Sequence, residues 1–266
     1  MPVLTFLCDN DALPGMEKEW GLSVALELDN GSLWLWDTGQ TAIFLRNAER
    51  LGIDVNRAQG LALSHGHFDH TGGLPALLEN GFSGQIYAHP GTVRARWNLI
   101  AEKRSIGTPT PLPLFTAVQG RQTLAPGLEM FTDIPRKPGL FQAVEGFFYD
   151  AQGQEPDTVP DDAFLVLDSP QGKIILLGCC HSGLENSLLH FRETTGVERI
   201  HAVIGGLHLY RVEEPEWESV ARCLEEFDVR FLAAGHCTGE KAIRFLAERL
   251  TCTVTRIGSG KRLEFN

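Results

Sequence analysis

The chain has 266 residues, 43% of them hydrophobic, and a formal net charge of −11. That length and apolar content are sufficient for one globular domain, and no run of about 18 apolar residues predicts a membrane-spanning helix. The acidic balance argues against broad nucleic-acid binding, and the N-terminus lacks a signal-peptide pattern, so we expect a cytoplasmic protein without nucleic-acid or membrane partners.

The first part of the chain alternates predicted strands and turns. Strands over 22–28 and 32–36 flank the turn Asp29-Asn30-Gly31, which is typical of a β-hairpin. Asp37 follows the second strand, and apolar residues at helical spacing then predict a helix over 41–51. We interpret Asp37 as a residue that supports the site, in preference to a direct metal ligand.

A cluster of metal-binding residue types follows the next predicted strand, which covers 60–63. The segment reads Ser64-His65-Gly66-His67-Phe68-Asp69-His70-Thr71-Gly72-Gly73, so it holds three of the nine histidines of the chain. Imidazole and carboxylate groups are the usual ligands of zinc and related ions. His65 and His67 lie on one side of an extended backbone, whereas Asp69 and His70 follow the turn. The segment can therefore supply two neighbouring metal ions, and this density disfavours a polar loop with scattered histidines.

The stretch 91–160 breaks the regular alternation of strands and helices. It follows a strand predicted over 85–90. Loops of this length in compact domains are usually functional. We therefore interpret the stretch as a lid-like insertion over the site, within a single domain that covers 1–266, in preference to a solvated excursion with short strands.

Basic and aromatic residues gather in this insertion, and an acidic protein needs such local cations to admit an anion. The residues beside Trp97 are Arg94, Arg96, Lys103 and Arg104. The predicted substrate-binding residues are His89, Arg94, Arg96 and Arg136. For His89 the alternative is a structural histidine at a strand end, and for Arg136 it is a surface arginine after a proline turn.

The regular pattern returns after residue 160. A second hairpin is predicted from strands over 164–168 and 173–178. Helical spacing then predicts helices over 184–194, 216–227 and 240–250, with strands between and after them.

Three later histidines, His181, His208 and His236, share one context, because each follows an apolar strand and lies beside glycine. In sheet folds, ligand and catalytic groups gather at strand ends. Two metal ions need more ligands than the segment 65–70 supplies. We therefore predict His181 and His236 as further metal ligands, and His208 as a proton donor or substrate ligand.

The spacing His-x-His-x-Asp-His after a strand resembles the signature of the metallo-β-lactamase superfamily. The resemblance implies an α/β fold of the αββα type, with two mixed sheets face to face, helices outside and the metal site at one sheet edge. The implied cofactors are two divalent metal ions, with zinc favoured and iron or manganese as alternatives. The predicted metal ligands are His65, His67, Asp69, His70, His181 and His236, and the predicted catalytic residues are Asp69 and His208.

The sequence departs from this superfamily at two ligand positions. The usual pattern has a bridging aspartate in a strand-end Gly-Asp, whereas the matching strand here ends in Gly178-Cys179. At the start of that hairpin, Asp161 and Asp162 stand where a histidine is usual. We expect His181 to supply a replacement ligand, and Cys179 or Cys180 are alternatives as thiolate ligands. The six cysteines form no CxxC pair, which favours reduced thiols.

Further motifs resemble one branch of the superfamily, which contains the archaeal 7,8-dihydropterin-6-methyl-4-(β-D-ribofuranosyl)aminobenzene-5′-phosphate synthase and bacterial relatives. They are Asp-Ile-Pro-Arg at 133–136, Leu-Gly-Cys-Cys-His-Ser-Gly at 177–183, Gly-Gly-Leu-His-Leu at 205–209 and Gly-His-Cys-Thr-Gly at 235–239. The resemblance implies a metal-dependent hydrolase or transferase acting on a small anionic substrate, phosphorylated and pterin-like. The alternative from another class is a non-catalytic, metal-dependent small-molecule sensor. The oligomeric state stays open.

Overall fold

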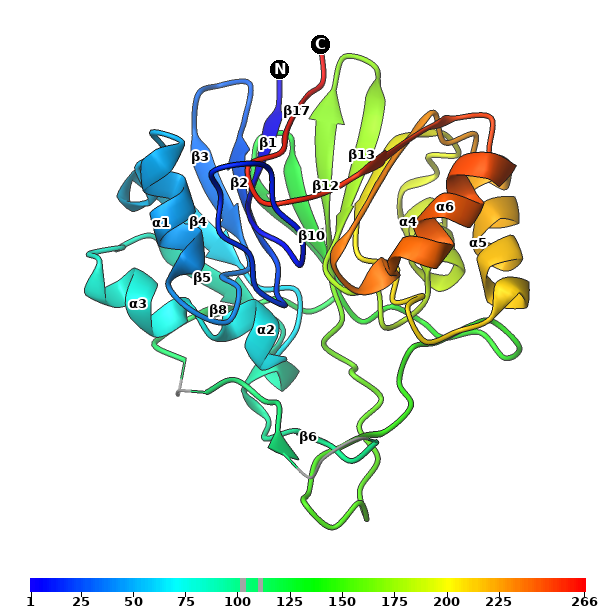
Figure 1. The fold of residues 1–266 in the computed structure, drawn as a ribbon, viewed down its shortest axis with the longest axis horizontal. Helices are drawn as coiled ribbons and strands as arrows, with labels where there is room; N and C mark the ends of the chain where they lie inside the picture. The colour runs from blue at the N-terminus through cyan, green and yellow to red at the C-terminus, as the bar shows by residue number, and fades with distance from the viewer. Residues whose placement is uncertain (101–103, 110–111) are drawn as a thin grey trace.

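The computed structural model describes residues 1–100, 104–109 and 112–266. In this part of the chain, two seven-stranded sheets pack face to face, and helices cover the outer face of each sheet (Figure 1). The mixed αββα sandwich predicted from the sequence is therefore confirmed. Both chain termini lie at one edge of the sandwich, away from the small strand β6 (Trp97–Asn98) below the opposite edge (Figure 1).

The first sheet contains both antiparallel and parallel pairs. Its strands are β1 (Val3–Cys8), β2 (Ser23–Glu27), β3 (Leu33–Trp36), β4 (Ala58–Ala62), β5 (Gln85–Ala88), β8 (Thr116–Ala117) and β17 (Arg262–Glu264). Neighbouring strands follow the order β17-β1-β2-β3-β4-β5-β8. The predicted hairpin forms from β2 and β3, whereas β3, β4 and β5 run parallel. Gly31 in the hairpin turn has a φ of 78°, which glycine adopts without steric cost.

The second sheet is antiparallel at one side and parallel at the other. Its strands are β9 (Arg121–Ala125), β10 (Leu128–Phe131), β12 (Phe164–Ser169), β13 (Gly172–Leu177), β14 (Ile200–Gly205), β15 (Phe231–Ala234) and β16 (Thr253–Arg256). Their spatial order is β16-β15-β14-β13-β12-β10-β9. The predicted second hairpin forms from β12 and β13, and β13 to β16 run parallel to one another.

The helices lie close to their predicted positions. Those on the first sheet are α1 (Ile43–Arg50), α2 (Phe68–Thr71) and α3 (Leu74–Glu79), and those on the second are α4 (Leu184–Thr195), α5 (Glu214–Glu226) and α6 (Glu240–Arg249). The short 3₁₀ turns are η1 (Val55–Arg57), η2 (Pro90–Val93) and η3 (His236–Thr238). The sequence did not predict α2, which lies inside the histidine-rich segment. Among the described helices, none is both long and apolar enough to cross a membrane.

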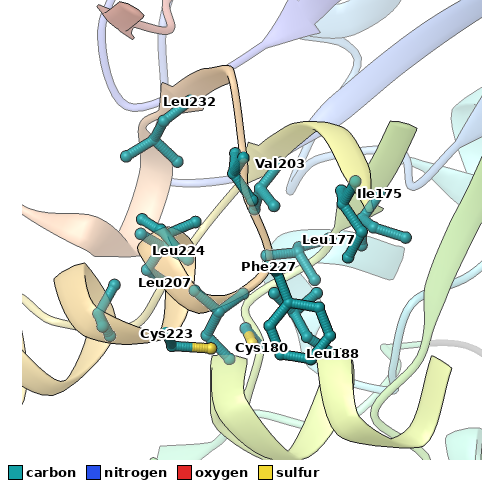
Figure 2. Close-up of a cluster of buried hydrophobic side chains, with 14 of the residues drawn as sticks. Ile175, Leu177, Cys180, Leu188, Val203, Leu207, Cys223, Leu224, Phe227 and Leu232 are labelled. Carbon is teal, nitrogen blue, oxygen red and sulfur yellow. The ribbon is translucent and has the colours of Figure 1, made fainter. Parts of the chain in front are cut away.

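Three layers of apolar side chains hold the sandwich together. The layer between the sheets includes Trp36 and Leu165, and the layer beneath α1 and α3 includes Phe44. Figure 2 shows the third layer, in which Val203 of β14 and Phe227 after α5 pack between the second sheet and its helices. Because both faces of these strands are covered, their sequences read as nearly continuous apolar runs. The packed layers give the strand ends a rigid support.

The stretch 91–160, predicted as one lid-like insertion, is divided in the structure. Its middle part, 116–131, supplies β8 to the first sheet and β9 and β10 to the second. The small strands β6, β7 (Arg104–Ser105) and β11 (Phe147–Phe148) form a separate three-stranded sheet. Ile106, Phe147 and Val159 pack together as its small apolar core. The middle part of the stretch therefore belongs to the sandwich itself, and the prediction of a lid applies only to the remaining segments.

The parallel strands determine where the functional residues meet. In the first sheet β3 and β4 are parallel, and in the second β13, β14 and β15 are parallel. Parallel neighbours end at the same edge of a sheet. The segments that follow these strands begin at Asp37, Leu63, Gly178, Gly206 and Gly235. The histidines predicted from the sequence lie on these segments.

Candidate metal centre

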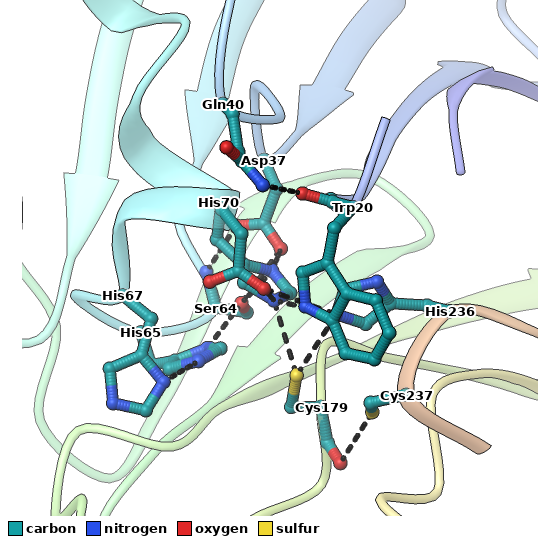
Figure 3. Close-up of polar contacts among 12 residues, drawn as sticks. Trp20, Asp37, Gln40, Ser64, His65, His67, His70, Cys179, His236 and Cys237 are labelled. Atoms are coloured by element: carbon teal, nitrogen blue, oxygen red, sulfur yellow. Dashed lines mark hydrogen bonds and ion pairs between the residues drawn. The ribbon is translucent and has the colours of Figure 1, made fainter. Parts of the chain in front are cut away.

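His65 and His67 follow β4, and the backbone at His67 is extended, as the sequence predicts. His67 has φ and ψ of −81° and 145° and directly precedes α2. The imidazoles face each other, with His65 Nε2 and His67 Nδ1 2.9 Å apart (Figure 3). The one-turn helix α2 then carries Asp69 and His70, both buried. The turn thus divides the motif into two pairs of ligands.

The first cluster of donor atoms consists of His65, His67 and His181. One ligand atom from each lies within 4.8 Å of the other two, and all three side chains are buried. His181 reaches the cluster from the segment after β13. His67 Nε2 and His181 Nε2 are buried and have no hydrogen-bond partner among the described residues. Buried polar atoms without a partner are costly, so these nitrogens indicate a missing binding partner.

The second cluster consists of Asp69, His70, His236 and Cys179. The Nε2 atoms of His70 and His236 are 3.1 Å apart, and Cys179 Sγ lies 3.2 Å from each (Figure 3). Asp69 Oδ2 is 3.7 Å from His70 Nε2 and 3.6 Å from His236 Nε2. The carboxylate and the thiol, from different segments of the chain, therefore both approach the same pair of imidazole nitrogens.

Polar groups of the protein lie within hydrogen-bond distance of the Nδ1 atom in four of these imidazoles. His70 Nδ1 lies 2.7 Å from Asp37 Oδ2, and a carboxylate only accepts, so His70 donates from Nδ1. Ser64 Oγ donates to the same carboxylate over 2.7 Å and therefore accepts from His65 Nδ1, 2.8 Å away. His181 Nδ1 donates to the carbonyl of Ala143 over 2.6 Å. In His65 and His181, Nε2 is left with a free lone pair that faces the cluster, whereas Nε2 of His70 offers its lone pair only after the imidazolium loses a proton.

His236 is held in the same way by the N-terminal segment. Its Nδ1 lies 3.1 Å from Asn10 Oδ1, and Asn10 Nδ2 donates to its carbonyl over 2.9 Å. Its backbone N–H donates to the buried carboxylate of Asp9 over 3.0 Å. Burial raises the pKa of Asp9 to about 7. Asp9 and Asn10 thus support His236 although neither was predicted to belong to the site.

Burial sets the protonation of these groups in the metal-free protein. It lowers the pKa of His65, His67, His181 and His236 well below the ordinary value, and neighbouring positive charges lower it further. Burial alone would also lower the pKa of His70, but the carboxylates of Asp37 and Asp69 outweigh it and raise that pKa to about 9. The four imidazoles with lowered pKa values are therefore neutral, and the neutral imidazole is the form in which histidine ligates metal.

Close backbone packing keeps the two clusters together. A Cβ atom at Gly66 would overlap the carbonyl of Thr92, and one at Gly178 would overlap the side chain of Ser64. Asp37, His208 and His236 adopt φ values of 57°, 49° and 47°, which residues other than glycine rarely adopt. Strained backbone of this kind persists where the surroundings over-determine it, and it clusters at functional sites.

Asp161 and Asp162, noted above as departures, support the two histidine segments. Asp161 Oδ2 accepts from the backbone N–H of Gly66 over 2.8 Å, and its other oxygen pairs with Arg96. Asp162 Oδ2 accepts from the N–H of Ser182 over 2.7 Å. Through Gly66 and Ser182, these carboxylates therefore hold the backbone next to His65, His67 and His181.

The three cysteines near the site have different surroundings. Cys179 occupies the position of the missing aspartate and points into the second cluster, whereas Cys180 lies in the apolar core with Ser187 Oγ 3.7 Å away. Of the two predicted alternatives, the structure places only Cys179 among the donor atoms. The sequence analysis missed Cys237, whose thiol also lies within 4.8 Å of Cys179 and His236 donors. The one sequence feature that could have identified Cys237 is its position directly after His236.

The donor set suits divalent first-row ions. Zinc takes imidazole, carboxylate and thiolate ligands, and four such atoms around one ion at about 2.0–2.3 Å lie roughly 3.3–3.7 Å apart. The five separations given above for the second cluster run from 3.1 to 3.7 Å. In the first cluster, one ion would satisfy the buried Nε2 atom of His181 that has no partner. The described residues can therefore hold one ion in each cluster.

A cavity of about 620 Å³ opens directly onto both clusters. His67, Asp69 and Cys179 form part of its floor, and His208 and Cys237 line it beside them. The His208 ring lies 4.5 Å from that of His181, measured between centroids. Aromatic walls come from Trp20, Phe68, Phe147 and Tyr210. A small molecule can thus reach the donor atoms, and His208 lies beside them in the cavity lining.

The four predicted substrate-binding residues lie elsewhere and do not line this cavity. Arg96 is fully buried, with Nε 3.3 Å from Asp157 and a second pair to Asp161. Arg94 pairs with Glu155 over 2.7 Å, and Arg136 donates to the carbonyl of Val159 over 2.8 Å. His89 faces Asp133 at 3.3 Å. Each of these four side chains already has at least one polar partner within the protein, which the composition of the sequence does not reveal. Lys103 lies outside the described residues.

Comparisons with known proteins agree with this geometry. Residues 21–236 match the family model of the metallo-beta-lactamase superfamily. The chain is 29% identical to the 7,8-dihydropterin-6-methyl-4-(beta-D-ribofuranosyl)-aminobenzene-5′-phosphate synthase of Methanocaldococcus jannaschii, over 93% of this chain and 90% of that protein. An uncharacterized protein of the same archaeon is 27% identical, over 92% and 94%. The crystal structure of Tm1679, a metal-dependent hydrolase of the beta-lactamase superfamily, gives a TM-score of 0.86 with 27% identity over 99% of both chains. The resemblance inferred from the motifs is confirmed.

Replacing Asp37 with asparagine tests how far the supporting hydrogen bonds determine metal binding. Asp37→Asn removes the charged acceptor of His70 and Ser64, so we expect zinc affinity to fall by about 10- to 100-fold. Competition with a chromophoric chelator measures this affinity. Asp168→Asn, which changes an exposed aspartate on β12, serves as the matched control. Equal zinc affinity in Asp37→Asn and wild type would contradict the supporting role.

The buried imidazoles predict a pH dependence of stability in the metal-free protein. The pKa values of His65, His67, His181 and His236 are lower in the folded than in the unfolded state. Below about pH 6.5 the unfolded chain therefore binds protons that the folded chain does not, and stability falls by up to about 1.4 kcal/mol per pH unit for each such histidine. For His70 the effect of pH on stability has the opposite sign, because its pKa is higher in the folded than in the unfolded state. Its contribution to stability is present at low pH and is lost as the pH rises through about 9.

We expect the melting temperature of chelator-treated protein to fall between pH 7 and pH 5. The fall should be shallower in the double variant His65→Gln/His181→Gln, which removes two of the four buried imidazoles. His201→Gln, at a histidine on β14 outside the site, should change the slope less, because burial lowers the pKa of His201 less far than those of the four site histidines. Identical slopes in all three proteins would contradict this origin of the pH dependence.

Proposed function

The chain belongs to the metallo-beta-lactamase superfamily, and we propose that it is a metal-dependent enzyme that cleaves a phosphate or diphosphate ester of a small, pterin-like molecule. The observation that carries the proposal is the position of the donor atoms. Both clusters lie at the floor of one cavity that is large enough for a small molecule. A structural metal site is usually closed, whereas a catalytic site keeps a position accessible to substrate.

The choice of a phosphorylated substrate is supported by the similarity to the synthase of Methanocaldococcus jannaschii. That archaeal protein is a synthase whose printed name includes a dihydropterin and a 5′-phosphate, and it matches this chain nearly end to end. Tm1679, which shares the fold at a TM-score of 0.86, is described as a metal-dependent hydrolase. These two names leave the acceptor of the cleaved group open. Water is the acceptor in a hydrolase, and a second substrate is the acceptor in a transferase.

The site residues have distinct roles in this proposal. His65, His67 and His181 would hold one ion, and Asp69, His70, His236 and Cys179 the other. Two adjacent divalent ions polarise a phosphoryl oxygen, lower the pKa of water and stabilise the leaving oxygen. The carboxylate of Asp69 lies at the cavity floor, where an oxygen that does not bind the ion would be placed to accept a proton.

His208 is the candidate proton donor. It lines the cavity from the segment after β14, and its φ of 49° is maintained by packing against His181 and Tyr210. Its Nδ1 atom is buried and without a hydrogen-bond partner in the described part of the chain. An imidazole placed beside the substrate can protonate the leaving oxygen as the ester bond breaks.

A substrate screen tests the proposed activity. Protein reconstituted separately with zinc, iron(II) and manganese(II) is assayed against phosphomonoesters, phosphodiesters and diphosphate esters that carry aryl, ribosyl or pterin groups. We expect metal-dependent release of phosphate or diphosphate from at least one class. Binding of these esters without turnover under every metal would contradict the enzyme and favour the small-molecule sensor.

His208→Gln tests the proton donor. We expect its kcat to fall by about 100-fold with unchanged metal content, because general acid catalysis contributes roughly 10²–10⁴-fold. His89→Gln is the matched control, since His89 faces Asp133 outside the cavity lining. An unchanged kcat in His208→Gln would remove this residue from the mechanism.

A further inference from the structure

Two arginines line the cavity at a different depth from the metal-binding residues. The donor side chains at the floor are 0–7% exposed, whereas Arg104 on β7 and Arg211 after β14 are exposed. They reach the cavity from different segments, one from the small three-stranded sheet and one from the segment that carries His208. The cavity therefore has cationic groups at its rim in addition to the donor atoms at its floor.

Each rim arginine is held against an aromatic ring. The Arg104 guanidinium carbon lies 4.7 Å from the centroid of the Phe68 ring, and that of Arg211 lies 4.9 Å from the centroid of Tyr210. Stacking on a ring face orients the planar guanidinium and leaves the N–H groups on its edge free to donate. Phe68 directly precedes Asp69, so Arg104 is coupled to the loop that carries the metal ligands.

Neither guanidinium has a hydrogen-bond or carboxylate partner within the described ranges, unlike the other arginines considered above. Arg94 pairs with Glu155, and Arg96 pairs with Asp157 and Asp161. In a protein with a net charge of −11, two such cations at one cavity create a local attraction for anions. Arginine is also suited to bidentate binding of phosphate and carboxylate groups.

We propose that Arg104 and Arg211 bind a second anionic group of the substrate, separate from the phosphate that reacts at the metal floor. This inference rests on the proposed function, and it defines the substrate class as a molecule with two anionic groups separated by a flat ring. The walls between floor and rim are aromatic. The ring centroids of Trp20 and Tyr210 are 5.3 Å apart, and those of Phe147 and His67 are 4.9 Å apart. Such walls favour a planar ring over a flexible polar linker.

The test compares two inhibitors that cannot be hydrolysed at the metal floor. Phenylphosphonate carries one anionic group, and benzene-1,4-bisphosphonate carries a second on the opposite side of the ring. Their dissociation constants for zinc-loaded protein are measured by calorimetry. We expect the bisphosphonate to bind wild type at least about tenfold more tightly than phenylphosphonate. Hydrogen bonds to charged groups lower a dissociation constant by roughly tenfold or more.

The variants Arg104→Ala and Arg211→Ala should each lose most of this preference and keep the affinity for phenylphosphonate. Arg94→Ala, an exposed arginine outside the cavity lining, is the matched control and should keep the preference. Melting temperatures and zinc content of all variants establish that they are folded and loaded. Equal affinity of wild type for both compounds, or a full preference in both cavity variants, would overturn the proposal.

The outcome is separable from that of the proposed function. Inhibitor binding requires no turnover, so an arginine-dependent preference without any ester cleavage would support the two-anion subsite and contradict the enzymatic proposal. Ester cleavage with no arginine-dependent preference would support the enzyme and overturn the subsite.

Discussion

The buried carboxylate of Asp37 is the constraint on which the rest of the centre depends. It is fully buried and accepts three hydrogen bonds, from Ser64 N, Ser64 Oγ and His70 Nδ1, all at 2.7 Å. A buried charge is stable only when it is paired and hydrogen-bonded, so this carboxylate orders the groups around it. Through Ser64 it also fixes His65. One residue at the end of β3 thus orients a ligand of each donor cluster.

The double sheet brings the remaining ligands to this point. The segments after β13 and β15 carry Cys179, His181 and His236, and the close approach of Gly178 to Ser64 joins the two sheets at the site. Supporting residues then hold four of the five candidate ligand imidazoles, as Asn10 does for His236. His65, His181 and His236 are buried, neutral and held at Nδ1 before any ion binds, which reduces the reorganisation that binding requires.

The sequence predicted what depends on local pattern and failed where long-range packing decides. The strands, the helices and the donor residues His65 to His70 follow from periodicity and spacing, and His181 and His236 follow from their positions after strands. Arg96 was predicted at the substrate, yet it is buried between two aspartates, an arrangement that only the folded insertion creates. Arg211 was not singled out at all, because its position at the cavity depends on how the segment after β14 turns.

The most direct test of the account is the metal content of protein purified without added metal. Elemental analysis should find about one to two equivalents of zinc, iron or manganese in wild type, since the donor set suits these ions. The double variant His65→Ala/His67→Ala should lose most of this metal, whereas the His89→Gln control should retain it. A double variant that is folded and keeps the wild-type metal content would contradict the assignment of these histidines to a metal centre.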